Sequence, residues 1–479
     1  MQKPNSEERV LNIIIGTLIS AAAFFVSIGL GELWPFAWIA PIPVLILAFN
    51  SSARTAAIIS FLACLLGSLN QLTYLLSLLP IVVVIITLLL PAIIFSLAVL
   101  VTRQAVLRLE PWLSIFALPA IWTSYEWLLS IFSPHGTAGS LAYTQTDVLP
   151  LLQIASLTGL WGITFVLLLI PSGLAVAWHF RAEKQRAIPA LALCLAIGLL
   201  TLVYGWVRLS QSTSQPAVRV GLAATDETIQ YFRTEQPQEA LPVVEAYAHR
   251  IAELAKRGAQ VVVLPEKFVG VTPSYAGDVL RILGEAARSN KVTVVAGLNQ
   301  IETSARRNTA LVFSPDGKVV VEYDKVHLVP GWESRYQVGL KPGLFSMSAA
   351  VCGVAICKDM DFPDWTRAYT QAGAGLLVVP AWDFVRDARW HARMAIVRGV
   401  EGGFAVARSA QEGLLTVSDH YGRLLAEEIS SRTPEALLVS EVSPGPGRTL
   451  YSTLGNWFGW SNLLLLALII IKIVTSRRS

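Results

Sequence analysis

The chain has 479 residues, of which 54% are hydrophobic and only 15% are charged. Charged residues make up about a quarter of an ordinary soluble domain, so this composition argues against a wholly soluble protein. The formal net charge of +4 is small and gives no indication of a nucleic-acid partner.

Apolar stretches long enough to cross a bilayer dominate residues 1–207. A membrane-spanning helix needs about 20 mostly apolar residues, and we predict seven such helices here and one near the carboxyl end. The first is expected to be retained, because no small-residue cleavage site follows it. The predicted spans are 11–30, 36–50, 55–79, 81–102, 112–132, 154–180, 187–207 and 454–472.

Lysine and arginine residues gather in alternate loops between these predicted helices. The intervening loops at 31–35, near Pro80 and at 133–153 contain no Lys or Arg. Because basic loops of membrane proteins stay in the cytoplasm, both chain ends are expected inside and residues 208–453 outside. The basic residues are Lys3, Arg9, Arg54, Arg103, Arg108, Arg181, Lys184, Arg186, Lys472, Arg477 and Arg478.

The pattern predicts three parts: a seven-helix transmembrane domain at 1–207, an extracytoplasmic domain at 208–453, and a closing helix with a cytoplasmic tail at 454–479. Apolar strands alternate with helices in the middle part, which predicts sheets that pack on each other under a cover of helices. Strands are expected at 218–224, 260–266, 292–300, 308–326 (a hairpin), 351–357, 373–382, 404–410, 414–419 and 435–442, and helices at 237–257, 277–290 and 386–400.

Three residues at the ends of apolar strands form a candidate catalytic set: Glu266, Lys325 and Cys357. A carboxylate can take the proton of a thiol, and a nearby lysine can stabilise first the thiolate and then an oxyanion. The thiolate can attack a carbonyl carbon and form a thioester. A lone cysteine at a strand end is more often a small buried hydrophobe, so spacing alone leaves both readings open. Cys352 lies within its strand and is assigned to the core.

Residues 216–442 resemble the carbon–nitrogen hydrolase (nitrilase) superfamily, whose glutamate, lysine and cysteine come in the same order. The resemblance implies an α/β fold of the nitrilase-like α-β-β-α sandwich type. It implies Glu266 as general base, Lys325 as oxyanion stabiliser and Cys357 as nucleophile, with Glu333 as a second, supporting acid. The motifs that carry it are LPE, YDKVHL, CGVAICKDMDFP, VVPAWDF, HARMAIVRGVEGGFAVARSA and SDHYGRLLAE.

Nearly the whole chain resembles the bacterial apolipoprotein N-acyltransferase family, through SIGLGELWPFAWIAPIPVLILAFN, LPAIWTSYEWLLS and LAYTQTDVLPLLQIASLTGLWGITFV in the apolar part. The resemblance implies acyl transfer from a phospholipid, through a thioester on Cys357, to the N-terminal amine of a diacylglyceryl lipoprotein. It implies a multi-pass protein of the bacterial cytoplasmic (inner) membrane with a periplasmic or extracellular catalytic domain. A membrane-tethered amidase with the same three residues stays open as an alternative, and so does a non-catalytic binding protein.

Several features concern the choice of substrate. Lys358 and Asp359 follow the nucleophile where the acyltransferases are expected to have tyrosine and glutamate, so Asp359 retains an acid and Lys358 adds a positive charge. The stretch from Lys325 to Cys357 is short for that family. No metal or nucleotide motif is present, and no cofactor is expected. The expected substrate-binding residues are Lys358 and members of an apolar surface formed by Val329, Pro330, Trp332, Trp382 and Phe384. A place in the core stays open as the alternative for the five apolar residues.

Glu126 is an acidic residue within the fifth predicted span, where a charge is costly. One reading is a polar contact near a lipid headgroup, and the other is a hydrogen bond to a neighbouring helix or an interfacial position. The sequence leaves both readings open.

The predicted topology can be tested with a reporter fused after Gly317. A reporter that works only after export should be active there, because the alternate basic loops place residues 208–453 outside the cytoplasm. Activity would be measured in intact cells, and a reporter that works only in the cytoplasm should be silent at the same position. The opposite pair of results would invert the topology.

Overall fold

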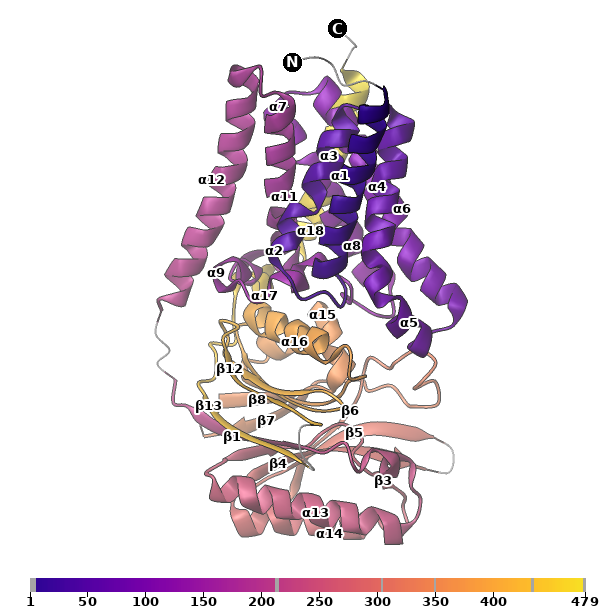
Figure 1. Ribbon diagram of the computed structural model, residues 1–479. Helices are drawn as coiled ribbons and strands as arrows, with labels where there is room; N and C mark the ends of the chain where they lie inside the picture. Colours follow the sequence, from indigo (N-terminus) through magenta and orange to yellow (C-terminus); the bar gives the residue numbers. More distant parts are fainter. Residues whose placement is uncertain (1–5, 212–214, 303–304, 349, 432–434, 477–479) are drawn as a thin grey trace. The chain divides into compact units, whose positions relative to one another are not determined.

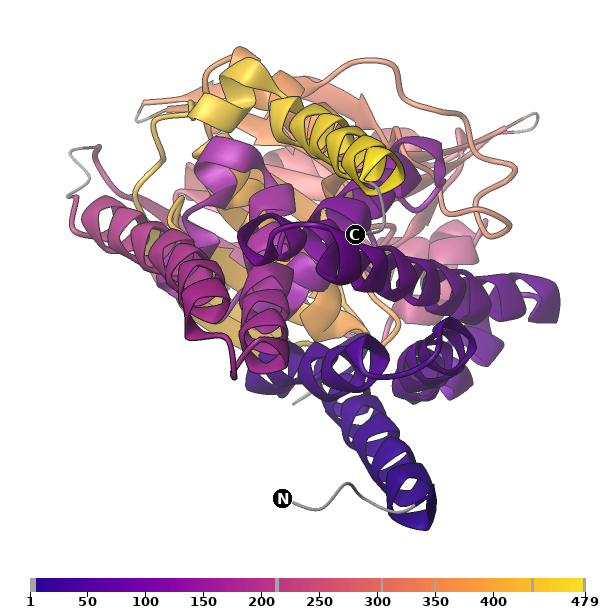
Figure 2. The same ribbon diagram turned by 90° about the horizontal axis from the view of Figure 1, so that it is seen from above.

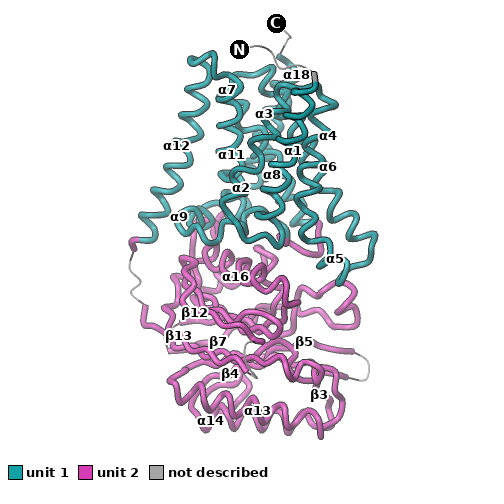
Figure 3. The backbone as a smooth tube through the Cα atoms, in the orientation of Figure 1, with its two compact units in different colours: residues 1–131, 139–209, 456–479 teal, residues 132–138, 210–455 magenta. Residues whose placement is uncertain are grey.

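The computed structural model describes residues 6–211, 215–302, 305–348, 350–431 and 435–476. The chain forms two compact units (Figure 3). Unit 1 contains Met1–Ile131, Gly139–Leu209 and Asn456–Ser479, and unit 2 contains Phe132–Ala138 and Ser210–Gly455. Three of the basic residues used for the topology, Lys3, Arg477 and Arg478, lie outside the described residues.

Unit 1 is helical throughout its described part. Seven helices there are long and apolar enough to span a membrane: Glu7–Ser27, Ala53–Leu78, Ile81–Arg108, Pro111–Phe132, Leu160–His179, Lys184–Leu209 and Trp457–Thr475. The individual helices are α1 (Ser6–Ser27), α2 (Pro35–Ile39), α3 (Pro41–Phe49), α4 (Ala53–Ser68), η1 (Leu69–Gln71), α5 (Leu72–Leu78), α6 (Ile81–Arg108), α7 (Pro111–Ser114), α8 (Ala117–Phe132), η2 (Leu141–Gln145), α9 (Leu149–Leu152), α10 (Ala155–Thr158), α11 (Leu160–His179), α12 (Lys184–Leu209) and α18 (Trp457–Thr475).

The second predicted span, 36–50, is the one that differs most from the structure. The apolar stretch Pro35–Phe49 is shorter than a full span and is divided into α2 and α3. Both pieces begin with a proline, Pro35 and Pro41. Proline suits the first turn of a helix and disrupts its interior, so a proline at 41 starts a new helix.

Arginine side chains of α6 satisfy backbone carbonyl groups at the ends of neighbouring helices. The Nε atom of Arg103 donates to the carbonyl oxygens of Ala48 and Ser51, both at 3.1 Å. The Nη1 atom of Arg108 donates to the carbonyl oxygen of Ile473 at 3.1 Å. The last carbonyl groups of a helix lack partners within it and carry partial negative charge. The carboxyl ends of α3, α6 and α18 therefore lie at one end of unit 1 (Figure 1).

The closing helix α18 packs on the middle of unit 1 and away from the first helix. Its residues Ile469 and Ile473 share a small core with Ala105 of α6 and Ala117 of α8. In the view from above, the indigo helix α1 and the yellow helix α18 lie on opposite sides of the helical bundle (Figure 2). The final helix is therefore an integral part of the bundle.

Glu126 of α8 is a buried hydrogen-bond acceptor for four donors within unit 1. Its Oε1 atom accepts from Trp122 Nε1 at 2.9 Å and from the backbone N–H of Leu141 at 2.8 Å. Its Oε2 atom accepts from the hydroxyl groups of Ser140 at 2.7 Å and Thr164 at 2.8 Å. Glu126 therefore joins α8 to α11 and to the start of η2, which supports the second of the two sequence readings.

Unit 2 is built from two sheets. The first sheet has the strand order β13-β1-β2-β4-β5-β6, with β3 paired to β4, and the second has the order β12-β11-β10-β9-β8-β7. Their bounds are β1 (Val218–Ala224), β2 (Val261–Val263), β3 (Gly270–Val271), β4 (Thr293–Ile301), β5 (Arg306–Phe313), β6 (Val319–Asp324), β7 (Gly343–Met347), β8 (Ala350–Val354), β9 (Ala374–Trp382), β10 (Ala405–Gln411), β11 (Leu414–Ser418), β12 (Leu424–Ile429) and β13 (Ala436–Val442).

Helices cover the outer face of each sheet (Figure 1). The first sheet is covered by α13 and α14, and the second by α15 and α16. Unit 2 is therefore an α-β-β-α sandwich, as the sequence predicted. Its helical elements are η3 (Ile229–Arg233), α13 (Pro237–Lys256), α14 (Ala276–Asn290), η4 (Cys357–Asp361), α15 (Pro363–Gln371), α16 (Ala388–Gly402) and α17 (Leu450–Leu454).

The continuous apolar strands are explained by burial of both faces of each sheet. Val261 and Val263 of β2 point into the core between the sheets, whereas Val262 points into the core beneath α13 and α14. Neighbouring residues of a strand face opposite sides, so a strand buried on both sides has no polar face to show. The strands before Glu266 and Cys357 end earlier than predicted. β2 stops at Val263, and β8 stops at Val354, so Cys357 instead opens the 3₁₀ turn η4.

The hydrogen bonds of Glu126 predict how its replacements affect the stability of unit 1. Glu126→Leu leaves buried donors without an acceptor, at a cost of about 1–3 kcal/mol each, so we expect a loss of at least about 3 kcal/mol. Glu126→Gln should cost less than about 1 kcal/mol, because the hydroxyl groups of Ser140 and Thr164 can accept from the new amide. Thermal unfolding of the detergent-solubilised variants measures both, and equal stability of the two would contradict the prediction.

Candidate active site

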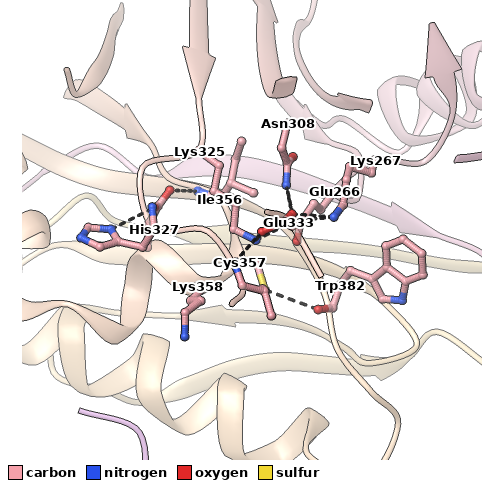
Figure 4. A network of polar contacts seen from close by, with 12 residues as sticks. Glu266, Lys267, Asn308, Lys325, His327, Glu333, Ile356, Cys357, Lys358 and Trp382 are labelled. Atoms are coloured by element: carbon pink, nitrogen blue, oxygen red, sulfur yellow. Dashed lines mark hydrogen bonds and ion pairs between the residues drawn. The ribbon is translucent and has the colours of Figure 1, made fainter. Parts of the chain in front are cut away.

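Two lysines and two glutamates of unit 2 form a buried network (Figure 4). The Nζ atom of Lys325 lies 2.9 Å from Glu266 Oε1 and 3.0 Å from Glu333 Oε2. The Nζ atom of Lys267 lies 2.6 Å from Glu333 Oε1 and 3.7 Å from Glu266 Oε1. Each charge thus has two partners of opposite sign, and the network of four is neutral when all are ionised.

Asn308 of β5 holds the two carboxylates together. Its Nδ2 atom donates to Glu266 Oε1 at 2.6 Å and to Glu333 Oε1 at 2.8 Å. The second oxygen of Glu333 also accepts from the backbone N–H of Val329 at 2.8 Å. The sequence analysis singled out neither Asn308 nor Lys267. Lys267 directly follows the predicted base, and Asn308 is a polar residue at the start of a buried strand. Either feature could have indicated these residues from the sequence.

The network shifts the pKa values of Lys325 and Glu333. Burial alone would lower the pKa of Lys325, but the carboxylates of Glu266 and Glu333 raise it well above its usual value. Burial alone would raise the pKa of Glu333, but the charges of Lys325 and Lys267 hold it well below the ordinary range. Lys325 is therefore an ammonium ion and Glu333 a carboxylate at neutral pH.

Cys357 lies at the first position of η4, with a positive φ of 43°. Its Sγ atom donates to the carbonyl oxygen of Trp382 at 3.4 Å (Figure 4). Burial raises the pKa of this thiol, the charge of Glu266 raises it further, and the charge of Lys325 opposes both. The thiol therefore needs a base before it can attack, and the carboxylate of Glu266 faces it from the neighbouring sheet.

Glu266 is placed by the second sheet as well as the first. It follows β2, and its backbone N–H donates to the carbonyl oxygen of Ala381 in β9 at 3.2 Å. Its own carbonyl oxygen accepts from Gln411 Nε2 of β10 at 2.9 Å. The candidate base is thus fixed against the sheet that carries Cys357.

Asp359 connects the turn of Cys357 to the segment that carries Lys325. Its side chain accepts hydrogen bonds from the backbone N–H groups of His327 at 2.8 Å and Ile356 at 3.0 Å. It also accepts from the hydroxyl group of Tyr323 at 2.7 Å. Asp359 is fully buried, and these contacts hold the two segments together.

The apolar residues expected to bind substrate fall on two loops. Trp332 is 55% exposed, and its ring lies 5.8 Å from that of Phe384. Trp382 is half-buried and donates through Nε1 to Glu412 Oε2 at 2.7 Å. Exposed Val385 continues the second loop. These side chains form an apolar surface beside the network, and the ammonium group of Lys267 lies 5.6 Å from the centre of the Trp382 ring.

Lys358 and Cys352 lie apart from the network. Lys358 is buried, and its side chain points away from Glu266 and Lys325 (Figure 4). The Nζ atom of Lys358 lies 3.2 Å from His135 Nδ1. Cys352 is fully buried in β8, and burial raises the pKa of its thiol to about 12. Among the described residues, no cluster of three or more His, Cys, Asp and Glu side chains could hold a metal ion.

An ion pair beside the apolar loop holds the start of α16. His391 Nε2 lies 3.0 Å from Asp387 Oδ2, and Asp387 Oδ1 accepts from the backbone N–H of Phe384 at 2.8 Å. Burial would lower the pKa of His391, but the charges of Asp387, Asp383 and Asp361 raise it to about 9. The imidazole is therefore charged at neutral pH and helps to hold the loop of Phe384.

Comparison with known proteins adds two family matches. The carbon–nitrogen hydrolase model matches residues 223–440. An omega-amidase (NIT2) of Mus musculus is 30% identical over 223 residues, which cover 40% of this chain and 79% of that protein. A crystal structure of an amidase from Nesterenkonia sp. is 23% identical, with a TM-score of 0.41, and covers 47% of this chain and 90% of that one.

The apolar part has a match of its own. The model of the apolipoprotein N-acyltransferase N-terminal domain matches residues 20–173. The chain belongs to the apolipoprotein N-acyltransferase family. The apolipoprotein N-acyltransferase of Geobacter metallireducens is 29% identical over 385 residues, which cover 72% of both chains. That of Gloeobacter violaceus is 26% identical over 363 residues, covering 71% of this chain and 68% of the relative. The protein is therefore a membrane-bound acyltransferase with a carbon–nitrogen hydrolase domain.

The raised pKa of His391 predicts a pH-dependent contribution to the stability of this acyltransferase. The folded pKa of about 9 exceeds the unfolded value of about 6.5, so the charged imidazole stabilises the fold below about pH 6.5 and this contribution is lost as pH rises through about 9. The upper limit is roughly 3 kcal/mol. Wild type should therefore unfold at a higher temperature than His391→Gln at about pH 6, and the two should converge at about pH 10. A constant difference would contradict the prediction.

Proposed function

We propose that the protein transfers an acyl chain from a phospholipid to the N-terminal amine of a diacylglyceryl lipoprotein, through a thioester on Cys357. The observation that carries the proposal is the neutral, buried network of Glu266, Lys325, Glu333 and Lys267 beside the Cys357 thiol. A soluble amidase would need such a site but no helical membrane unit, and this chain has both.

In the first half of the proposed reaction, the carboxylate of Glu266 takes the proton of Cys357. The thiolate attacks the ester carbonyl carbon of the phospholipid, and the ammonium group of Lys325 stabilises the oxyanion that forms. Collapse of this intermediate breaks the ester bond and leaves the acyl chain on sulfur. The departing lysophospholipid oxygen takes its proton from Glu266, which regenerates the carboxylate.

In the second half, the neutral amine of the acceptor attacks the thioester carbonyl carbon. Lys325 again stabilises the oxyanion, Glu266 takes a proton from the attacking nitrogen, and the Cys357 thiolate leaves and is reprotonated. An amide bond is formed and the free thiol is restored. Glu333, Lys267 and Asn308 need not touch the substrate, because their contacts are with Glu266 and Lys325.

The proposed location is the bacterial cytoplasmic (inner) membrane, with the catalytic domain on its outer side. Both proposed substrates are held in a bilayer by their own acyl chains, so a site at the membrane's outer face is where they can meet. The apolar surface of Trp332, Trp382 and Phe384 is the proposed contact for the transferred chain. Exposed apolar surface of this kind commonly marks a binding site.

A hydrolase is the second candidate function, favoured by the similarity of residues 223–440 to carbon–nitrogen hydrolases. The two functions share Glu266, Lys325 and Cys357 and differ only in the second half, where water or an amine receives the acyl group. Incubating acylated enzyme with a lipopeptide acceptor separates them. Formation of an N-acylated peptide supports the transferase, and release of free fatty acid alone supports the hydrolase.

The proposed mechanism predicts which variants accumulate acyl-Cys357. Glu266→Gln should slow acylation by about 100- to 10,000-fold, because the base acts before the thioester exists. Lys325→Met should have a similar effect by removing the oxyanion's partner, and the double variant should be little worse than either one. Intact mass spectrometry after incubation with phospholipid measures the adduct.

Cys352→Ala is the matched control for Cys357→Ala. It removes a buried thiol five residues away in the chain and should leave acylation nearly unchanged, whereas Cys357→Ala should abolish it. Normal acylation of Glu266→Gln would show that another group activates the thiol. Equal loss from both cysteine variants would remove the assignment of Cys357 as nucleophile.

A further inference from the structure

Unit 2 contains a short segment that comes from the other half of the chain. Phe132–Ala138 follows α8 and precedes η2, yet it packs as part of unit 2. The segment forms its own tight turn, since the backbone N–H of Gly136 donates to the carbonyl oxygen of Ser133 at 3.1 Å. The reaction described above assigns it no role.

This segment is bound to the carbonyl oxygen of Asp361, the last residue of the nucleophile turn η4. The backbone N–H of Thr137 donates to that oxygen at 3.0 Å, and the Thr137 hydroxyl group donates to it at 2.7 Å. Gly136 has a φ of +53°, and a Cβ atom there would lie 2.5 Å from the same oxygen. Only glycine lets the backbone approach so closely in this conformation.

His135 of the same segment is the hydrogen-bond acceptor for the ammonium group of Lys358. The Nζ atom of Lys358 lies 3.2 Å from His135 Nδ1, whereas its nearest carboxylate oxygen, on Asp361, is 3.7 Å away. Burial, and then the charge of Lys358, lowers the pKa of His135 to about 4. The imidazole is therefore neutral at physiological pH and can accept. A buried ammonium group without such an acceptor would be costly.

We propose that His135 and Thr137 are positioning residues for the acyl transfer, which act by holding the turn that carries Cys357. Thr137 fixes the end of the turn through the Asp361 carbonyl group, and His135 fixes the side chain that directly follows the nucleophile. The two contacts hold η4 on the side away from Asp359, which ties the same turn to the Lys325 segment. This inference rests on the proposed function for its kinetic test alone.

The titratable groups around Cys357 come from several elements. Glu266 follows β2, Lys325 follows β6, and Asp383 and Arg408 belong to the end of β9 and to β10. In the native geometry their combined effect, with burial, is to raise the thiol's pKa. A turn that is no longer held should relax toward the value of a free thiol, about 8.5, and the sulfur should also lose its alignment with the base and the oxyanion site.

Two readouts on the full-length protein should therefore decrease in Thr137→Val, the rate of acylation and the pH at which the thiol is labelled. The rate of acyl-Cys357 formation should fall by about 10- to 100-fold, the usual penalty for small displacements of a reacting group, with little change in KM for the phospholipid. The pH at which iodoacetamide half-maximally labels Cys357 should shift downward. Thr137→Ser keeps the hydroxyl donor and should behave as wild type in both measurements.

His135 offers a second, independent pair of variants. Its side chain is only half-buried, so the change is unlike a core truncation. His135→Asn retains an acceptor for Lys358 and should stay close to wild type, whereas His135→Leu should reproduce the two shifts of Thr137→Val. Labelling of Cys352, which is fully buried, reports whether each variant is folded. If Cys352 becomes labelled in Thr137→Val, that variant is not folded, and the comparison of His135→Leu with His135→Asn then tests the proposal.

Unchanged acylation rates and unchanged labelling profiles in folded Thr137→Val and His135→Leu would overturn the inference. The labelling arm needs no phospholipid, so it is independent of the proposed reaction. If wild type forms no acyl-Cys357 with any phospholipid while the labelling profiles still shift, the proposed function fails and the positioning role stands. If wild type is acylated and the variants match it in both measurements, the positioning role fails and the proposed function stands.

Discussion

The burial of the Lys325 ammonium group between two carboxylates is the interaction on which the catalytic unit depends. Removing three charges from water is costly unless each finds opposite charges and hydrogen bonds nearby. The ammonium group of Lys267 and the amide of Asn308 complete the set. The members come from the ends of β2 and β6, from β5 and from the segment after β6. The first sheet must therefore hold these segments in place for each charge to keep its partners.

Cys357, the proposed nucleophile, follows β8 of the second sheet, so the packing of the two sheets sets its distance from the network. Cys357 belongs to the same inter-sheet core as Val263 of β2 and Val378 of β9. The thiol thus has an apolar wall on one side and charges on the other. Desolvation by this wall raises the pKa of the thiol, so the proposed reaction needs Glu266 to take its proton. The same core that gives the unit its stability therefore suppresses unassisted reaction of the sulfur.

How much could be predicted from the sequence depended on whether the information was local. Glu266, Lys325 and Cys357 each follow an apolar strand, and strand patterns are visible in a few residues, so the sandwich and the position of each residue were predictable. The change in backbone direction at Cys357 was not predictable, because CGVAIC has the pattern of a continuous strand and a hydrophobic pattern does not indicate a positive φ angle. The second predicted span had the composition of a membrane helix, and Pro41 divided it. Asn308 and Thr137 were not predicted as parts of the site because their hydrogen-bond partners are distant in the chain.

Unit 2 is assembled from two stretches of chain separated by part of the helical unit. A chain emerges during synthesis from its amino end, so Phe132–Ala138 is made before any strand of the sandwich exists. Its docking on η4 is a contact of high sequence separation, and such contacts form slowly because a long loop must first close. The pairing of Val218 with Val442 in the first sheet spans an equally long stretch of chain, so closure of that sheet and docking of this segment are both long-range events. The turn that carries Cys357 is therefore complete only when two stretches of chain made at different times have folded together.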